Sequence, residues 1–202
     1  SDARGERLLE ERGEPLDDLE QVATLGFEID GAVINAGGGF AWPYASEATG
    51  SDLAGLRGAL EAVWRSSPLF GKAQLCFESG RYLCAGSGTL LTTVLDVKKA
   101  GSKIFVVLDT GIHHLGGMSG LGRIPRSAIT LINLTAQREG EMVADVVGPL
   151  CSPLDSLARG QKMSPVEVGD VLAVPNVGAY GLTASLLGFL SHATPVEAAY
   201  RG

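Results

Sequence analysis

The spacing of apolar and polar residues changes near Ala85, so we predict a domain boundary there. Before this point, residues 31–36 and 73–77 form short apolar runs with the length of buried strands. Between them, apolar residues recur at spacings of three and four over residues 53–64, which predicts an amphipathic helix. Strand, helix and strand in this order are typical of a parallel α/β barrel.

After Ala85 the pattern becomes one of short β-branched segments separated by turns. These segments are residues 88–98, 104–108, 129–134, 142–147 and 166–174. Such spacing predicts an antiparallel sandwich or barrel. We also expect two helical pieces within residues 4–25, and a helix at 180–190 that returns to the barrel.

The predicted fold class is therefore α/β plus all-β. A partial (β/α) barrel would occupy residues 1–84, and an antiparallel β-barrel or sandwich would occupy residues 85–178. A helix and tail would follow in residues 179–202.

Composition narrows the possible functions. The chain has 202 residues, 45% of them hydrophobic, and a net charge of −7, which argues against a nucleic-acid partner. Apolar runs are too short to cross a membrane, so we expect no membrane association. Three cysteines in no metal-binding spacing favour a reducing compartment. We therefore expect a cytoplasmic protein.

Two glycine-containing segments that follow predicted strands suit an anion. Glu78, Gly80 and Arg81 combine a carboxylate, a flexible turn and a planar set of donors. Residues 37–39 are three glycines, which let backbone N–H groups approach a phosphate. If either segment stood alone, we would prefer a plain turn for residues 37–39 and a structural ion pair for Glu78 and Arg81.

Four segments, in order, resemble the pyridoxal-phosphate decarboxylases that act on ornithine, arginine and diaminopimelate. Residues 78–82 are similar to that family's E-P-G-R-aromatic segment, with Ser79 in place of proline. Residues 37–40 resemble its G-G-G-F loop, residues 148–155 its G-P-x-C-x-x-x-D loop, and residues 178–181 its G-A-Y-G turn. The resemblance covers roughly residues 30–200 and implies an alanine-racemase-like barrel followed by a β domain.

The resemblance implies decarboxylation at the Cα of an amino acid, with pyridoxal 5′-phosphate as cofactor. Glu78 would meet the pyridine nitrogen, and a negative charge there keeps the ring protonated as an electron sink. Cys151 would return a proton to Cα in the active site of the neighbouring subunit, which implies a homodimer with shared sites. The residues that would hold the phosphate are Gly37, Gly38, Gly39, Gly80, Arg81 and Tyr180.

Three residues bear on the substrate: Thr110, Ser152 and Asp155. Decarboxylases of diamino acids have an acidic residue after the loop cysteine, where this chain has Ser152. Some of them also have an acidic residue at the position where this chain has Thr110. A cationic side chain would lack its countercharge there. The sequence thus resembles natural-product decarboxylases, and we expect an acylated or carrier-protein-bound amino acid.

Other features leave alternatives open. His113 and His114 are adjacent and would face opposite sides of a strand, so we expect loop or pocket-lining residues and no metal site.

No lysine matches the segment to which the family attaches its cofactor, and all three histidines come late in the chain. We expect either the C-terminal portion of a longer decarboxylase or a non-catalytic binding or regulatory relative; a racemase fits the G-P-x-C loop less well.

Overall fold

The computed structural model describes residues 33–47, 50–66, 73–116 and 129–201. The predicted helices within residues 4–25 lie outside these ranges. The chain forms two compact units. Unit 1 comprises residues 1–39 and 51–79, and unit 2 comprises residues 40–50 and 80–202. The domain boundary that we expect near Ala85 stays a prediction.

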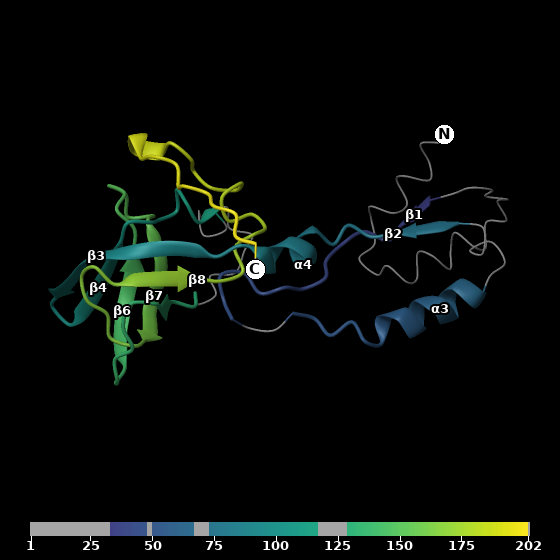
Figure 1. The fold of residues 1–202 in the computed structure, drawn as a ribbon, viewed down its shortest axis with the longest axis horizontal. Coiled ribbons are helices and arrows are strands. Elements are labelled where there is room, and N and C mark those ends of the chain that lie inside the picture. Colours follow the sequence, from purple (N-terminus) through teal and green to yellow (C-terminus); the bar gives the residue numbers. More distant parts are fainter. Residues whose placement is uncertain (1–32, 48–49, 67–72, 117–128, 202) are drawn as a thin grey trace. The chain divides into compact units, whose positions relative to one another are not determined.

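Unit 1 contains the predicted strand, helix and strand. Strand β1 (Val33–Asn35) pairs in parallel with β2 (Gln74–Cys76), and helix α3 (Leu56–Ser66) lies between them in the sequence (Figure 1). The four apolar residues of the helix that the spacing places on one face are half-buried, and most other residues of α3 are exposed. These residues are Leu56, Leu60, Val63 and Trp64.

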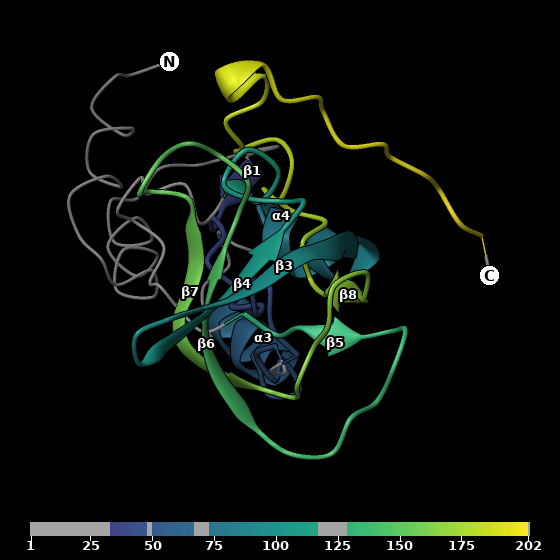
Figure 2. The same cartoon turned by 90° about the vertical axis from the view of Figure 1, so that its left-hand side faces the viewer.

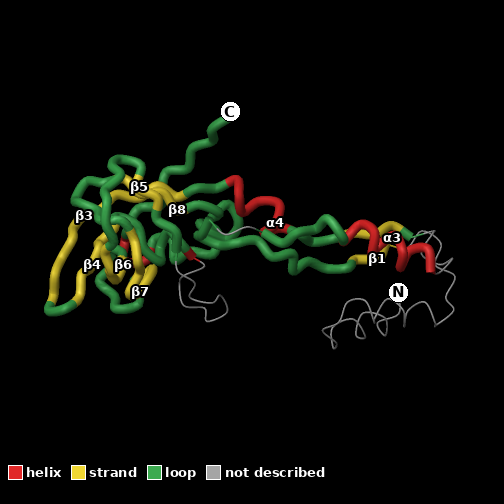
Figure 3. Tube along the Cα trace, turned by 90° about the horizontal axis from the view of Figure 1, so that it is seen from below, coloured by secondary structure: helices red, strands yellow, loops and turns green. Residues whose placement is uncertain are grey.

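Unit 2 is built on a curved six-stranded sheet (Figures 1 and 2). The strands lie in the order β5 (Ile132–Asn133), β8 (Val171–Val174), β3 (Leu90–Ala100), β4 (Lys103–Leu108), β6 (Met142–Val147) and β7 (Ser156–Met163). Two short helices, α4 (Gly80–Cys84) and η2 (Ala85–Ser87), precede the sheet. Figure 3 shows mostly loop after β8, apart from the short helix η4 (Phe189–Ser191).

Alternate residues of the strands form the core of unit 2. Val94, Val106, Leu108, Val146 and Leu172 are all nearly inaccessible to solvent. The hairpin between β3 and β4 turns at Gly101, whose φ of +61° favours glycine. This alternation explains why β3, β4 and β6 were predictable from the sequence.

Unit 2 differs from the expectations in four respects. The sheet is not wholly antiparallel, because β4 and β6 pair in parallel across the long connection of residues 109–141. The predicted helix at 180–190 is a series of turns with positive φ at Tyr180, Gly188 and Leu190. Strand β7 was missed because it is a polar edge strand, and of residues 166–174 only Val171–Val174 form a strand.

Candidate functional site

Glu78 lies against the glycine loop at the carboxyl ends of β1 and β2. Its Oε1 accepts a hydrogen bond from Asn35 Nδ2 at 2.6 Å, and its backbone N–H donates to the Gly37 carbonyl at 2.8 Å. A Cβ on Gly38 would come within 2.2 Å of the Glu78 carbonyl oxygen. The predicted residues 37–39 and 78 therefore lie together in unit 1. Asn35 was missed, although it stands directly before the glycine segment.

Arg81 and Tyr180, predicted to bind phosphate, lie together in unit 2. The guanidinium carbon of Arg81 is 5.6 Å from the centre of the Tyr180 ring, within range of a cation–π contact. Gly178 brings this turn close to helix α4, because a Cβ there would lie 2.1 Å from the Cys84 carbonyl oxygen. Tyr180 has a φ of +65° and is about half-exposed. The turn therefore presents the phenol to solvent beside a cation.

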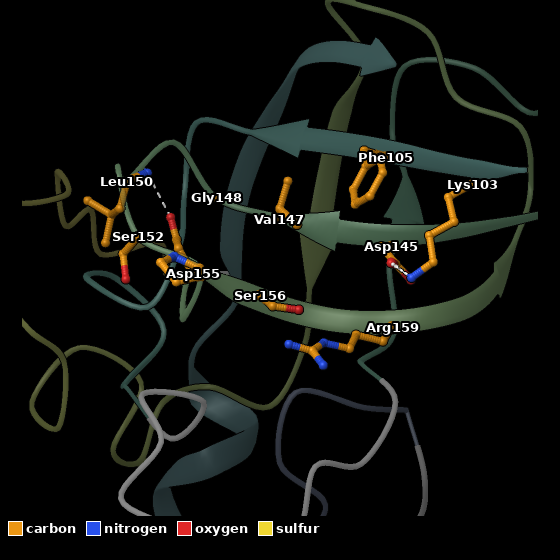
Figure 4. A pocket seen from close by; sticks show the side chains of 11 residues that line it. Lys103, Phe105, Asp145, Val147, Gly148, Leu150, Ser152, Asp155, Ser156 and Arg159 are labelled. Atoms are coloured by element: carbon orange, nitrogen blue, oxygen red, sulfur yellow. Dashed lines mark hydrogen bonds and ion pairs between the residues drawn. The ribbon is translucent and has the colours of Figure 1, made fainter. Parts of the chain in front are cut away.

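Asp155 joins the loop that carries Cys151 to the turn after β4. Its Oδ1 accepts the Ile112 backbone N–H at 2.8 Å. Its Oδ2 accepts the Leu150 backbone N–H at 2.8 Å, which is the dashed line at Asp155 in Figure 4. The residue is 3% exposed. Both carboxylate oxygens are thus used within the fold, as a buried carboxylate requires.

Two glycines make room for this carboxylate. A Cβ on Gly111 would lie 2.2 Å from Asp155 Oδ1, and a Cβ on Gly148 would lie 2.3 Å from its Oδ2. The Gly148 N–H also donates to the Asp155 carbonyl at 3.1 Å. The G-P-x-C-x-x-x-D segment therefore closes into a compact loop because its first and last residues contact each other.

Cys151 lies in this loop as an exposed free thiol. The next residue, Ser152, turns the loop sharply, because its N–H donates to the Leu150 carbonyl and its Oγ accepts the Leu154 N–H. A cavity of about 510 Å³ adjoins the loop and extends over β4, β6 and β7 (Figure 4). Ser152 and Asp155 are among the residues that line it.

Thr110 is the third residue predicted to bind substrate, and it is buried. Its Oγ1 lies 3.0 Å from His114 Nδ1. The preceding residue, Asp109, accepts hydrogen bonds at Oδ1 from the Thr92 hydroxyl and the Thr93 N–H. The turn after β4 therefore has polar groups that already bond to one another.

The histidines lie in a loop, as predicted, but they do not face opposite ways. Residues 112–114 form a turn, and the rings of His113 and His114 are 3.8 Å apart. The ring of His192 is 5.0 Å from His113. His113 is buried, and burial, followed by the nearby His114, lowers its pKa to about 4. Our expectation failed because the strand β4 ends before these residues.

The described part of the chain adds two negative findings. No group of three or more His, Cys, Asp or Glu residues within it could hold a metal ion. None of its helices has both the length and the apolarity needed to cross a membrane. The described lysines at positions 98, 99, 103 and 162 lie in β3, β4 and β7, and Lys72 lies outside the described residues.

A family model described as pyridoxal-dependent decarboxylase, C-terminal sheet domain, matches residues 45–178. The chain belongs to this family. The match includes the whole six-stranded sheet and the loop of Cys151. The family predicted from four short motifs is therefore confirmed.

Two curated decarboxylases are similar over most of the chain. The L-glutamyl-(BtrI acyl-carrier protein) decarboxylase of Niallia circulans is 34% identical over 81% of this chain and 40% of its own length. The diaminopimelate decarboxylase of Aquifex aeolicus is 33% identical over 82% of this chain and 37% of its own length. The chain thus spans about two fifths of these relatives. Both are named as decarboxylases, which gives the non-catalytic alternative no support.

Solved decarboxylases share the fold. The diaminopimelate decarboxylase of M. jannaschii has a TM-score of 0.75 at 26% identity, covering 90% of this chain and 41% of that one. The Helicobacter pylori enzyme complexed with L-lysine has a TM-score of 0.69 at 25% identity, covering 85% of this chain and 41% of that one. The sheet domain of this decarboxylase family is therefore present in unit 2.

Proposed function

We propose that the complete protein is a pyridoxal-phosphate-dependent amino-acid decarboxylase, and that this chain supplies its sheet domain and part of its barrel. The observation that best supports this is the contact of Glu78 with the glycine loop at the carboxyl ends of β1 and β2. Ligands of parallel α/β folds bind at this end of the strands. The family membership of the chain agrees with this assignment.

The described residues fit a phosphorylated pyridine. Positive φ angles at Gly37 (+72°) and Gly39 (+91°), and the lack of space for a side chain at Gly38, give a loop of bare backbone suited to a phosphate. Bound pyridoxal phosphate supplies an electron sink that lets a carboxylate leave Cα. Glu78, oriented by Asn35, would hold a proton on the ring nitrogen. Further phosphate contacts would come from Gly80, Arg81 and Tyr180, and the lysine that attaches the cofactor would come from outside the described residues.

Cys151 would be the weak acid that gives a proton to Cα. Its exposed position on a tightly turned loop allows it to reach a second chain, and we propose a homodimer in which each loop serves the neighbouring site. Asp155 would act as a positioning residue for this loop. We prefer this role to direct substrate contact because the backbone N–H groups of Ile112 and Leu150 occupy both of its oxygens.

The substrate side chain would end in an uncharged group. Thr110 and Ser152 carry no charge, and the carboxylates of Asp109 and Asp155 are engaged within the fold. A second ammonium group would find no free carboxylate among these residues. An acylated or carrier-bound amino acid fits better, and the similar N. circulans enzyme is named for such a substrate.

A cofactor titration of the complete protein tests the proposal. We expect pyridoxal phosphate to bind and, after borohydride reduction, to label one lysine other than the four in β3, β4 and β7. Replacing Glu78 by Gln should weaken binding at least roughly tenfold while leaving the fold intact. Absence of binding by the wild-type protein, or a label on Lys98, Lys99, Lys103 or Lys162, would contradict it.

A further inference from the structure

Unit 2 contains a second cavity, of about 350 Å³, beside Tyr180. It is lined by residues 87–90, by His114, by residues 177–178 and 180–183 of the turn that includes Tyr180, and by residues 195–198. The last of these ranges, which we name the wall segment, comes from a part of the chain that no motif singled out. Its position therefore influences which groups can enter the cavity.

The wall segment has little else to hold it. Val196 is 95% exposed, and residues 196–201 are all exposed. No hydrogen bond between described residues involves residues 194–201. The segment therefore depends on what fixes the chain just before it.

His114 provides this attachment through a chain of two hydrogen bonds. Its Nε2 lies 2.9 Å from the Ala193 carbonyl oxygen, which can only accept, so Nε2 carries the proton. In the neutral ring Nδ1 is then an acceptor, and it receives the hydroxyl proton of Thr110 at 3.0 Å. One tautomer of His114 thus satisfies both partners, and Thr110, which is 1% exposed, anchors it to the core.

His113 and His192 support the same attachment. His192 precedes Ala193, and its ring lies 5.0 Å from the buried ring of His113, which in turn lies at a tilt beside the ring of His114. Burial lowers the pKa of His113 to about 4, so this ring carries no charge near neutral pH. A neutral ring between two others avoids repulsion within the cluster.

We propose that His114 is a positioning residue that fixes the wall segment along the Tyr180 cavity and so limits the groups that the cavity accepts. The proposal rests on the proposed function, in which Tyr180 contacts the cofactor phosphate. The wall would then be a specificity element additional to Ser152.

Cleavage at Glu197 by endoproteinase Glu-C reports release of the wall segment. Replacing His114 by Phe keeps a ring of similar shape but removes both hydrogen bonds, and should speed this cleavage roughly three- to tenfold. His114→Gln, which can still donate to Ala193, should cleave near the wild-type rate. Thr183→Val, in the same cavity but outside this hydrogen-bond chain, is the matched control. Equal rates for wild type and His114→Phe, or an equal increase in the control, would overturn the proposal.

Imidazole nitrogen NMR of the wild-type protein tests the same point without any substitution. We expect the His114 ring to carry a proton on Nε2, as its contact with the Ala193 carbonyl requires, and a proton on Nδ1 alone would overturn the attachment. Neither measurement requires the cofactor. Failure of pyridoxal phosphate to bind the wild-type protein would therefore count against the proposed function and the specificity role that rests on it, while the attachment of the wall segment by His114 is judged by the two measurements above.

Discussion

Glu78 and Asp155 are both carboxylates of the predicted site, yet their surroundings differ. Among the described residues, Glu78 is exposed and accepts a side-chain hydrogen bond from Asn35, whereas Asp155 is 3% exposed and accepts two backbone N–H groups. The first has lone pairs left for a ligand, while the second has used its oxygens within the fold. A carboxylate in a family motif can thus serve chemistry or serve the loop, and its partners distinguish the two.

The largest effect should follow removal of the Asp155 charge. Asp155→Asn turns an NH₂ group toward a backbone N–H and leaves a buried donor unpaired, so we expect the free energy of unfolding to fall by about 2 to 4 kcal/mol. Urea denaturation of the variant measures this loss. Asp96→Asn is the control, because Asp96 is partly exposed and its ion pair is with the exposed Lys98; it should change stability by less than about 0.5 kcal/mol. If Asp155→Asn and Asp96→Asn had equal free energies of unfolding, Asp155 would have no special structural role, and the contrast with Glu78 would not hold.

Asp170, a buried aspartate whose side-chain partners lie outside the Cys151 loop, sharpens the comparison. Asp170 bonds to Arg138, Asn133 and the Glu167 N–H. The side-chain hydrogen bond from Arg138, followed by the backbone N–H of Glu167, lowers the pKa of Asp170 to about 2. Its stabilising contribution is therefore present above about pH 4 and is lost as pH falls toward 2.

Asp170→Asn should lower the free energy of unfolding by about 2 kcal/mol at pH 7 and by less at pH 3. Cysteine 151 should react with iodoacetamide at the wild-type rate in this variant, because Asp170 does not hold its loop. Denaturation at the two pH values and timed alkylation check both points. A faster reaction of the thiol would show that loss of any buried aspartate loosens the whole unit.

His113 gives a smaller effect that depends on pH. Its pKa of about 4 in the folded protein lies below the ordinary histidine value of 6.5, so the unfolded chain binds more protons between these values. The contribution of the neutral His113 ring to the free energy of unfolding should be fully present above pH 6.5. It should be lost as pH drops toward 4, by at most about 1.4 kcal/mol per pH unit. His113→Phe should remove this part of the slope. The same slope in wild type and variant, from denaturation at several pH values, would contradict the assignment.

The smallest structural effect is expected at Cys151. An exposed side chain contributes little to packing, so Cys151→Ala should change the free energy of unfolding by less than about 0.5 kcal/mol. If the thiol is the proton donor to Cα, decarboxylation by the complete protein should nevertheless fall at least roughly tenfold. Wild-type turnover by this variant would assign the proton to another group.

The elements that the sequence predicted best are those whose pattern is set by local burial. Strands β3, β4 and β6 alternate core and surface residues, and α3 shows one apolar face. The parallel pairing of β4 with β6 depends on a crossover between distant segments, which no local pattern specifies. Strand β7 is polar because it lies at the sheet edge.

The candidate site likewise has residues that the local sequence reveals and contacts that it does not reveal. The motifs identified the residues at 37–39, 78 and 148–155, because glycine and charge at a strand end are visible in the sequence. They did not reveal that Asn35 orients Glu78, that Asp155 is enclosed by backbone donors, or that His114 reaches Ala193. These contacts join residues that are far apart in the sequence or depend on which way a turn faces.

The most direct test of the contrast measures Glu78→Gln and Asp155→Asn in the complete protein, by urea denaturation and by pyridoxal phosphate titration. We predict that Glu78→Gln keeps the wild-type free energy of unfolding to within about 0.5 kcal/mol and loses cofactor affinity at least roughly tenfold. Asp155→Asn should instead lose stability, and while folded it should bind the cofactor within about threefold of wild type. Wild-type cofactor affinity in Glu78→Gln, or wild-type stability in Asp155→Asn, would contradict the roles assigned to these carboxylates.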